Sequence, residues 1–443
     1  MAGSREIRKP GDLVLAECGS LWSQRENQLT RAIGVLGIVV LMMIGPAAAQ
    51  EKPNVPPRVP ETPLSWMEGP SLTGDWGGLR TRLEERGVTP YATYSVEGFG
   101  TLSGGSPNGA DWTSQFEFGL DVDLEKLVGW GGGSVQASFL WIEGTDPSER
   151  IGNLNAISSL SAPAAARVYR LWYQQALGPV TMKLGQVVAS DDFMVSAAAD
   201  LYLNAGFGTY PTFTANINAP TYPLGGPGAL VSWQAVESVT LQSGVYVADA
   251  GPNDGGNHGF GWSTDHGWAV FAEAVYRASL GGQAGVYKLG GYYDTARFAD
   301  LVTGASDRGN WSVYVLGDQT LYGGADGVPT VTVFAGLGLS PQQDRNTVYY
   351  YGQAGVNVVG LVPFRPKDVL GLAATYTRFS DDFVDANRVA GTPVTSQEAI
   401  VELTYQAVIT PFLTFQPDLQ LVFDANQSRR DAVVVGVRLI AVF

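Results

Sequence analysis

The chain has 443 residues, of which 45% are hydrophobic and only 16% charged, and its 56 glycines exceed the roughly 7% of an average protein. This composition excludes a disordered chain and a coiled coil. The 42 acidic and 27 basic residues give a net charge of -15, so we expect no nucleic-acid partner. Cys18 is the single cysteine, which excludes an intrachain disulfide scaffold and a thiolate metal site.

The N-terminal region predicts a signal peptide. An apolar run of 13 residues, Ala32–Ile44, follows Arg31 and precedes Ala47-Ala48-Ala49. The run is shorter than the ~20 residues that a membrane-spanning helix needs, and small residues after it are typical of a cleavage site. We therefore expect residues 1–49 to comprise an upstream extension plus the signal peptide, with a short membrane anchor as the alternative. The mature chain would then carry a net charge of -16.

Two short segments follow the cleavage site. Residues 50–70 contain six prolines and predict a stiff, extended linker. Trp76–Arg86 has two leucines one helical turn apart among charged residues, with Asp75 as N-cap and Gly87 as stop. We expect residues 71–88 to form a short periplasmic helical segment that is either a plain solvent-facing helix or a plug or assembly contact.

From residue 89 to 443 apolar and polar residues alternate with a period of two. After the signal peptide no apolar run is long enough for a spanning helix, so a membrane protein here must be a β-barrel, whose signature is a series of ~10-residue alternating segments. The clearest segments have apolar residues at Phe116, Phe118, Leu120, Val122 and Leu124, at Val401, Leu403, Tyr405 and Ala407, and at Leu413, Phe415, Leu419 and Leu421.

A soluble β-sandwich would show the same alternation, and the aromatic residues distinguish the two classes. The chain has 11 Trp, 19 Tyr and 18 Phe, many near the ends of the predicted strands. Rings at strand ends are expected at the interface between a bilayer and water, whereas a sandwich would bury most of them. The polar faces carry charged residues, amides, threonine and glycine, which indicates a wet lumen. We therefore predict an all-β fold, an antiparallel outer-membrane β-barrel.

The C-terminus ends in the same pattern. Val433, Val435, Val437, Leu439 and Ala441 occupy every second position before the terminal Phe443. An ordinary edge strand is one interpretation. Together with a signal peptide, however, an apolar alternation ending on phenylalanine resembles the sorting signal of bacterial outer-membrane barrels, so we expect Phe443 to act as an assembly signal.

Motifs for catalysis are weak. His258 and His266 are eight residues apart, a spacing that matches no usual zinc pattern, and we place both in a solvated loop. Ser263, Asp265 and His266 lie too close in sequence for a nucleophilic triad. The pairs Asp191-Asp192 and Asp381-Asp382 would point to opposite faces of a strand, so neither pair could flank a glycosidic bond. We predict no enzyme activity, no metal site and no cofactor.

The polar face of the strands is the remaining candidate site. Charged and amide side chains can hydrogen-bond sugar hydroxyls, whereas a simple ion pore needs only rings of like charge. The alternative is that these residues only solvate a wide channel. The candidate substrate-binding residues are Arg170, Gln174, Lys183, Glu117, Lys288, Glu402, Gln406, Gln420 and Arg438.

The segment Leu72–Arg80, LTGDWGGLR, resembles the opening motif of the carbohydrate-selective porins, the OprB family. Further blocks are similar to this family in order along the chain: Arg170–Gln175, Lys183–Gln186, Leu203–Gly208, Pro341–Asn346, Arg365–Asp368, Glu402–Gln406 and Gln416–Gln420. The resemblance implies sixteen strands, a channel narrowed by inward loops and passive uptake of sugars. Arg170 and Lys183 lie in matching blocks and are our candidates for the narrow part.

We therefore expect a porin in the outer membrane of a Gram-negative bacterium that passes mono- or oligosaccharides into the periplasm by diffusion. An outer-membrane barrel enzyme and a non-selective or organic-acid porin are the alternatives. The expected partners are sugars, outer-membrane lipid and the outer-membrane assembly machinery, and the barrel is either a homotrimer or a monomer.

Overall fold

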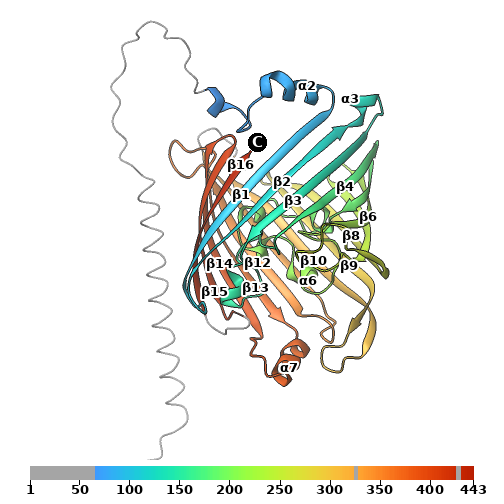
Figure 1. The fold of residues 1–443 in the computed structure, drawn as a ribbon, viewed down its shortest axis with the longest axis vertical. Coiled ribbons are helices and arrows are strands. Elements are labelled where there is room, and N and C mark those ends of the chain that lie inside the picture. Colours follow the sequence, from blue (N-terminus) through green and yellow to red (C-terminus); the bar gives the residue numbers. More distant parts are fainter. Residues whose placement is uncertain (1–64, 324–327, 426–430) are drawn as a thin grey trace, which may run out of the picture. The chain divides into compact units, whose positions relative to one another are not determined.

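The computed structural model describes residues 65–323, 328–425 and 431–443, which form a closed antiparallel barrel of sixteen strands (Figure 1). Cys18, the predicted signal peptide and most of the predicted linker lie outside the described residues. Each strand pairs with its neighbours in sequence, and β1 pairs with β16. The strands are β1 Val88–Ser103, β2 Ala110–Asp123, β3 Gly133–Gly144, β4 Ala165–Leu177, β5 Val180–Val187, β6 Gly226–Val236, β7 Val239–Asp249, β8 Ser263–Leu280, β9 Gln283–Ala299, β10 Ser306–Tyr322, β11 Thr330–Leu339, β12 Val348–Val359, β13 Val369–Phe379, β14 Gln397–Thr410, β15 Leu413–Phe423 and β16 Ala432–Val442.

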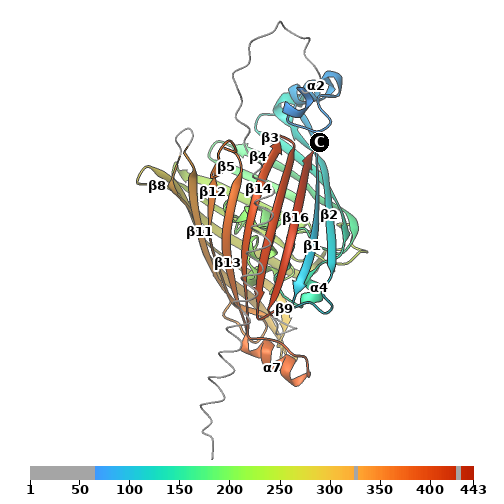
Figure 2. The ribbon, with the colours of Figure 1, turned by 90° about the vertical axis from the view of Figure 1, so that its left-hand side faces the viewer.

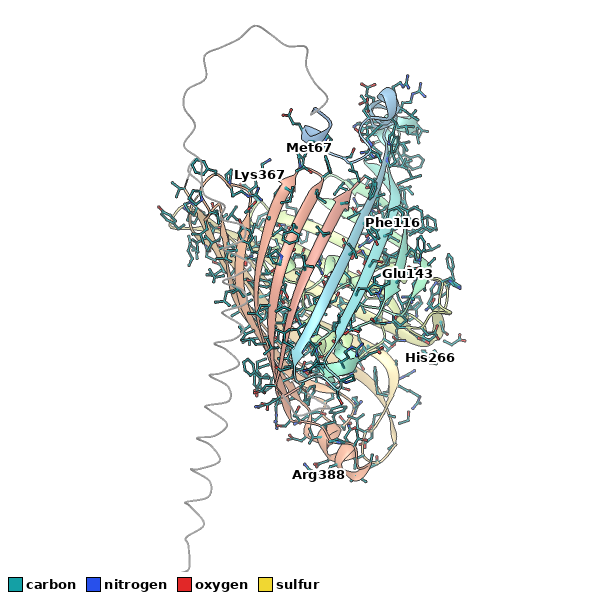
Figure 3. All side chains as sticks on the ribbon, turned by 60° about the vertical axis from the view of Figure 1, so that its left-hand side comes forward. Met67, Phe116, Glu143, His266, Lys367 and Arg388 are labelled. Carbon is teal, nitrogen blue, oxygen red and sulfur yellow. The ribbon has the colours of Figure 1, made fainter. Side chains whose placement is uncertain are left out.

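The alternation predicted from the sequence corresponds to the two faces of the barrel wall. On β2, Phe118 and Leu120 are 40% and 45% exposed on the outer surface, while Glu117 turns inward. Figure 3 shows Phe116 and Glu143 on the outer wall between the two ends of the barrel. Because successive side chains of a strand point to opposite faces, the apolar set covers the outside and the polar set faces the lumen.

The last strand closes the barrel, so the interpretation of β16 as an edge strand is wrong. Val442 pairs with Thr93 of β1, and the backbone N–H of Phe443 donates to the Ala92 carbonyl oxygen at 2.9 Å. The Phe443 ring meets the Phe116 ring edge to face, with 6.1 Å between the centroids. Closure gives every strand two partners, which removes the unpaired edge that an open sheet exposes.

The predicted N-terminal helix is present but shorter than expected. The 3₁₀ turns η1 (Ser65–Glu68) and η2 (Trp76–Gly78) precede α2 (Leu79–Glu85). The prediction of one continuous helix from Trp76 is wrong, because Trp76 and Gly77 have φ of 51° and 68°. Asp75 nevertheless stabilises the helix start, since its Oδ1 accepts from the Thr81 N–H at 2.9 Å and the Thr81 hydroxyl at 2.8 Å.

The two ends of the barrel differ in the length of their connections. At one end the strands are joined by short turns and by α3 (Leu124–Val128), and the C-terminus and α2 lie at the same end (Figure 1). At the other end the connections are longer, and one carries α7 (Asp381–Val389), where Figure 3 places Arg388. We call these the short-turn end and the long-loop end. The short connections include residues 178–179, 237–238, 281–282 and 411–412, and the long ones include 145–164, 188–225, 250–262 and 380–396.

Two of the long connections fold into the barrel. The first inward loop, residues 145–164, contains α4 (Ser148–Ile151). The second inward loop, residues 188–225, contains α5 (Ala189–Asp192), η3 (Ala199–Leu201), η4 (Ala205–Phe207) and α6 (Pro211–Thr214). Figure 1 shows α6 within the ring of strands. Inward loops were implied by the family resemblance, and the structure confirms them.

The second inward loop packs an aromatic core against the inner wall. Phe193 and Phe213 of the loop each lie 5.2 Å, between ring centroids, from Phe271 of β8, and Tyr210 lies 5.0 Å from Tyr351 of β12. All five rings are at most 1% exposed. The loop therefore fills part of the predicted wet lumen, and part of the aromatic content packs this loop against the inner wall instead of facing the bilayer interface.

Hydrogen bonds from wall side chains fix the second inward loop around the barrel. The bonds involve β8, β10, β12, β14 and β15 in turn, so the loop follows the inner wall. They join Met194 N to Glu273 (3.2 Å), Ser196 Oγ to Asp318 (2.6 Å), Asn357 Nδ2 to the Ala198 carbonyl (2.7 Å), Leu203 N to Glu402 (2.6 Å) and Asn204 Nδ2 to Gln420 (2.9 Å).

Among the described residues, no helix is long and apolar enough to cross a membrane.

Candidate functional site

A bulge in β4 brings two consecutive side chains into the lumen. Ser138 of β3 pairs with Arg170, whereas the next residue, Phe139, pairs with Val168, so Tyr169 is the extra residue. A bulge re-aims side chains in this way and lets neighbours share a face. Tyr169 is 3% exposed, and Arg170 Cζ lies 4.2 Å from the centroid of its ring. The guanidinium is therefore supported on an aromatic face inside the barrel.

Arg170 joins the barrel wall to the second inward loop. Its Nε and Nη2 donate to the two oxygens of Asp191 on α5, at 2.6 and 3.0 Å, and its Nη1 donates to Glu117 Oε1 of β2 at 2.6 Å. The Tyr91 hydroxyl of β1 also donates to this Glu117 oxygen, at 3.3 Å. A bidentate contact to one carboxylate and a second contact to another fix the plane of the guanidinium.

Lys183 makes the parallel contact from the next strand. Its Nζ lies 2.5 Å from Asp192 Oδ1 on α5 and 5.4 Å from the centroid of the Trp172 ring. Burial raises the pKa of the Asp192 carboxyl, and the Lys183 ammonium opposes this increase. The Asp192 backbone carbonyl accepts from Gln242 Nε2 of β7 at 2.6 Å, which also fixes the end of α5 to the wall two strands beyond β5.

These five charged residues, Arg170, Lys183, Glu117, Asp191 and Asp192, form what we call the lumen ion-pair cluster. Between 12% and 29% of each side chain remains exposed, so each pair is neither sealed in the core nor fully hydrated. The cluster contains two cations and three carboxylates. Paired donors and acceptors beside aromatic rings can bind a hydroxyl-rich solute from several sides.

Three further predicted residues lie on the inner face. Gln174 is half-buried and pairs in register with Lys183, so its side chain lies on the same face. Lys288 of β9 is 14% exposed, with its Nζ 3.8 Å from Glu273 Oε1. Gln406 of β14 is half-buried, four positions from Glu402 on the same face.

The other three predicted residues face inward but are covered by the inward loops. Glu402 and Gln420 are 0% exposed, and Glu402 accepts from the N–H groups of Leu203 and Asn204 at 2.6 and 3.0 Å. Arg438 is 7% exposed and donates to Glu97 Oε1 at 2.5 Å. The strand pattern placed these side chains on the correct face. Their contact with a passing solute stays a prediction. The inward loops cover these side chains, and the sequence pattern does not show which part of the lumen a loop fills.

The acidic residues that hold the loops were not predicted from the sequence. Glu273 accepts from Met194 N, Gln242 Nε2 and the Tyr314 hydroxyl, and Glu398 accepts from the N–H groups of residues 154 and 155. Asp191 and Asp192 were considered only as neighbours on a strand, whereas they lie on α5. The available signal was an acidic residue at an inward position of an otherwise apolar strand, as in Ala272-Glu273-Ala274.

The candidate catalytic residues do not assemble. His258 lies in the β7–β8 connection, as predicted. The prediction of a loop for His266 is wrong, because β8 already begins at Ser263, which pairs with Asp249 of β7. Figure 3 shows His266 on the outside of the barrel, and its Nε2 lies 3.5 Å from Asp249 Oδ2. The Ser263 hydroxyl accepts from the Asp265 N–H. In the described part of the chain, no group of three or more His, Cys, Asp or Glu side chains is placed to hold a metal ion.

Most of the chain matches one known protein family. The family model described as carbohydrate-selective porin, OprB family, matches residues 108–443. The chain belongs to this family. It is therefore an outer-membrane carbohydrate porin of a Gram-negative bacterium. The match begins after the Leu72–Arg80 motif, so the resemblance of that motif lies outside the matched residues.

Individual relatives are similar along most of the chain. Porin B of Pseudomonas aeruginosa is 27% identical, over 95% of this chain and 99% of that protein. The putative porin QuiX of Acinetobacter baylyi is 25% identical, over 83% of this chain and 92% of that protein. The high-pH structure of Pseudomonas putida OprB superimposes with a TM-score of 0.79 at 24% identity, covering 85% of this chain and 99% of that one. This likeness supports the sixteen-stranded fold.

Proposed function

We propose that this porin passes neutral mono- or oligosaccharides into the periplasm by diffusion, and that the lumen ion-pair cluster sets its selectivity. The observation that supports this proposal is the pairing of Arg170 and Lys183 with Asp191 and Asp192 of α5. Each cation already has a counter-charge within 2.6 Å, so the cluster offers hydrogen bonds without the unpaired positive charge that an anion channel needs.

The aromatic neighbours of the cluster suit a sugar ring. Tyr169 and Trp172 lie beside the two cations, and Tyr91 lies beside Glu117. Carboxylate and guanidinium groups exchange hydrogen bonds with hydroxyls, while an aromatic face covers the C–H side of the sugar. Few hydrogen bonds at a time keep binding weak, which a channel requires for rapid release.

The orientation follows from the length of the connections. Outer-membrane barrels have short periplasmic turns and longer extracellular loops. We therefore place the short-turn end, with α2 and the C-terminus, in the periplasm, and the long-loop end outside the cell. This orientation gives α2 the periplasmic position that we expected from the sequence, next to the first strand.

The test uses two double variants that break the same ion pairs from opposite sides. Replacing Arg170 and Lys183 by Ala removes two positive charges and should increase cation preference in planar bilayers. Replacing Asp191 and Asp192 by Asn removes two negative charges and should shift the reversal potential the other way. Both double variants should weaken the block of ion current by added sugar, because each loses hydrogen-bonding partners.

The variant His266→Ala is the matched control, since His266 lies outside the barrel, and it should change neither quantity. If both double variants have the same reversal potential as the native porin, the lumen ion-pair cluster does not lie on the diffusion path. A preference for organic anions over neutral sugars would favour the organic-acid porin, and hydrolytic activity lost in His266→Ala would favour the enzyme.

A further inference from the structure

A polar hollow opens at the long-loop end, between the first inward loop and the β7–β8 connection. Its volume is about 720 Å³, within the ~300–1,000 Å³ of small-molecule sites. Figure 2 shows α4, part of its wall, at the end of the barrel opposite the C-terminus. The polar residues that line it include Thr145, Asp146, Glu149, Asn153, Ser161 and Asn253.

One buried guanidinium holds the two walls of the hollow together. Arg167 of β4 is 2% exposed and donates through Nη2 to the carbonyl oxygens of Pro163, which lines the hollow, and of Asp254, the residue after the lining Asn253, at 3.0 and 2.9 Å. Its Nη1 donates to Asn253 Oδ1 at 3.4 Å. Because the side-chain oxygen of Asn253 accepts from Arg167, the side-chain NH₂ of Asn253 is the group that can donate to a ligand.

The rest of each wall is fixed independently. Arg150 donates through Nε to Asp111 of β2 at 2.7 Å, which fixes α4 against the barrel. In the β7–β8 connection, Asn257 is 4% exposed, and its Oδ1 accepts from the N–H groups of Gly259 and Gly261 at 3.0 and 3.1 Å. A ligand would therefore meet a preformed surface and would not have to order the loops.

The charge of the lining restricts the chemistry of a ligand. Asp146 and Glu149 contribute two carboxylates, and no Lys, Arg or His is among the lining residues. Asp146 accepts from the Ser148 N–H at 2.8 Å, and burial raises the pKa of its carboxyl. Carboxylates accept hydrogen bonds from hydroxyls and repel anions, so this surface matches a neutral polyol and disfavours a sugar acid.

We propose that this hollow is a capture site for neutral sugars on the extracellular side, separate from the lumen ion-pair cluster. The proposal rests on the sugar uptake and the orientation proposed above. The hollow also lies close to the cluster. The Tyr222 hydroxyl donates to the Leu160 carbonyl of the hollow's own loop at 2.6 Å, and the Tyr222 ring meets Tyr169, on which Arg170 lies, with 6.2 Å between centroids. Two packed tyrosine rings therefore separate the hollow from the cluster.

The test compares sugar block from the two sides of an oriented bilayer, using the full barrel and D-glucose. The double variant Glu149→Gln with Asn253→Ala removes one acceptor and one donor, so the block by glucose added on the long-loop side should weaken about ten-fold. Glu149→Trp, which fills the hollow from its exposed edge, should give the same loss without touching Asn253. Asp385→Asn on α7, at the same end but outside the hollow, is the control for lost surface charge and should keep native block.

The two proposals fail in different ways. Native block from the long-loop side in both hollow variants would overturn the capture site, and so would D-gluconate blocking as strongly as glucose. The Arg170 and Lys183 double variant should keep the component of block that depends on the hollow. If that double variant keeps native ion selectivity while the hollow variants lose block by sugar, the role of the lumen ion-pair cluster in selectivity is refuted and the capture site is supported.

Discussion

Glu402 provides the sharpest test of the loop anchoring, because the sequence predicted a sugar contact there and the structure places a buried anchor. The side chain is 0% exposed and accepts from the N–H groups of Leu203 and Asn204 at 2.6 and 3.0 Å. A buried N–H donor that loses its acceptor costs about 1–3 kcal/mol. The variant Glu402→Ala leaves two such donors, so we expect the segment around η4 to open at least ~2 kcal/mol more easily, which corresponds to a rise of more than ~30-fold in its open population.

Native-state hydrogen exchange measures this opening directly. The amides of Leu203 and Asn204 are themselves the donors to Glu402, so a peptide covering residues 199–208 reports the loss without an added probe. We expect the exchange of this peptide to accelerate by at least ~30-fold in detergent-solubilised Glu402→Ala, because local opening controls exchange in folded proteins. Single-channel recordings of the same variant should show larger current fluctuations as the loop moves.

Gln406→Ala is the matched control on the same strand and the same face. Gln406 is half-buried, and its side chain makes no hydrogen bond to the described residues, so the control should leave exchange of residues 199–208 unchanged. If residues 199–208 of Glu402→Ala exchange at the native rate while sugar block weakens, Glu402 does not anchor the loop, and the result would support a direct contact between Glu402 and sugar.

Two further predictions concern loop packing and barrel closure. A Cβ at Gly336 of β11 would lie 1.8 Å from the Tyr210 hydroxyl oxygen. Gly336→Ala should therefore displace the second inward loop and lower the free energy of unfolding by about 1–3 kcal/mol, measured as a lower thermal midpoint. Gly98→Ala is the control, because the space around its Cβ is open, and it should leave the midpoint unchanged. Deleting Phe443 removes its contact with Phe116 and should leave more unassembled periplasmic protein; normal accumulation of heat-modifiable barrel would refute the sorting role.

The barrel wall was predictable because its pattern is local. A strand exposes alternate residues to opposite faces, so Phe118 and Leu120 identify an outward face and Glu117 an inward one from sequence spacing alone. The same spacing predicted that Arg170 and Lys183 face the lumen. The outward residues need no specific partner other than lipid, and the requirement to pair all backbone groups restricts a membrane-spanning sheet to a closed barrel.

The loops were not predictable in this way, because their partners are far away in sequence. Leu203 and Glu402 are 199 residues apart, and Arg167 meets Asp254 across 87 residues. The pattern along β14 is the same whether Glu402 contacts water, a sugar or a loop N–H. Its burial depends on where residues 188–225 fold.

The sequence by itself therefore determined the strands, the two faces of the wall and the family, since these follow from period-two hydrophobicity and from local motifs. Only the tertiary structure decided which inward residues are accessible. Arg438 faces the lumen by the same alternation as Arg170, yet a loop covers Arg438, whereas 19% of the Arg170 side chain stays exposed. The physical reason is that solvation of a lumen residue depends on which long-range contacts displace water from it, and strand alternation contains no information about those contacts.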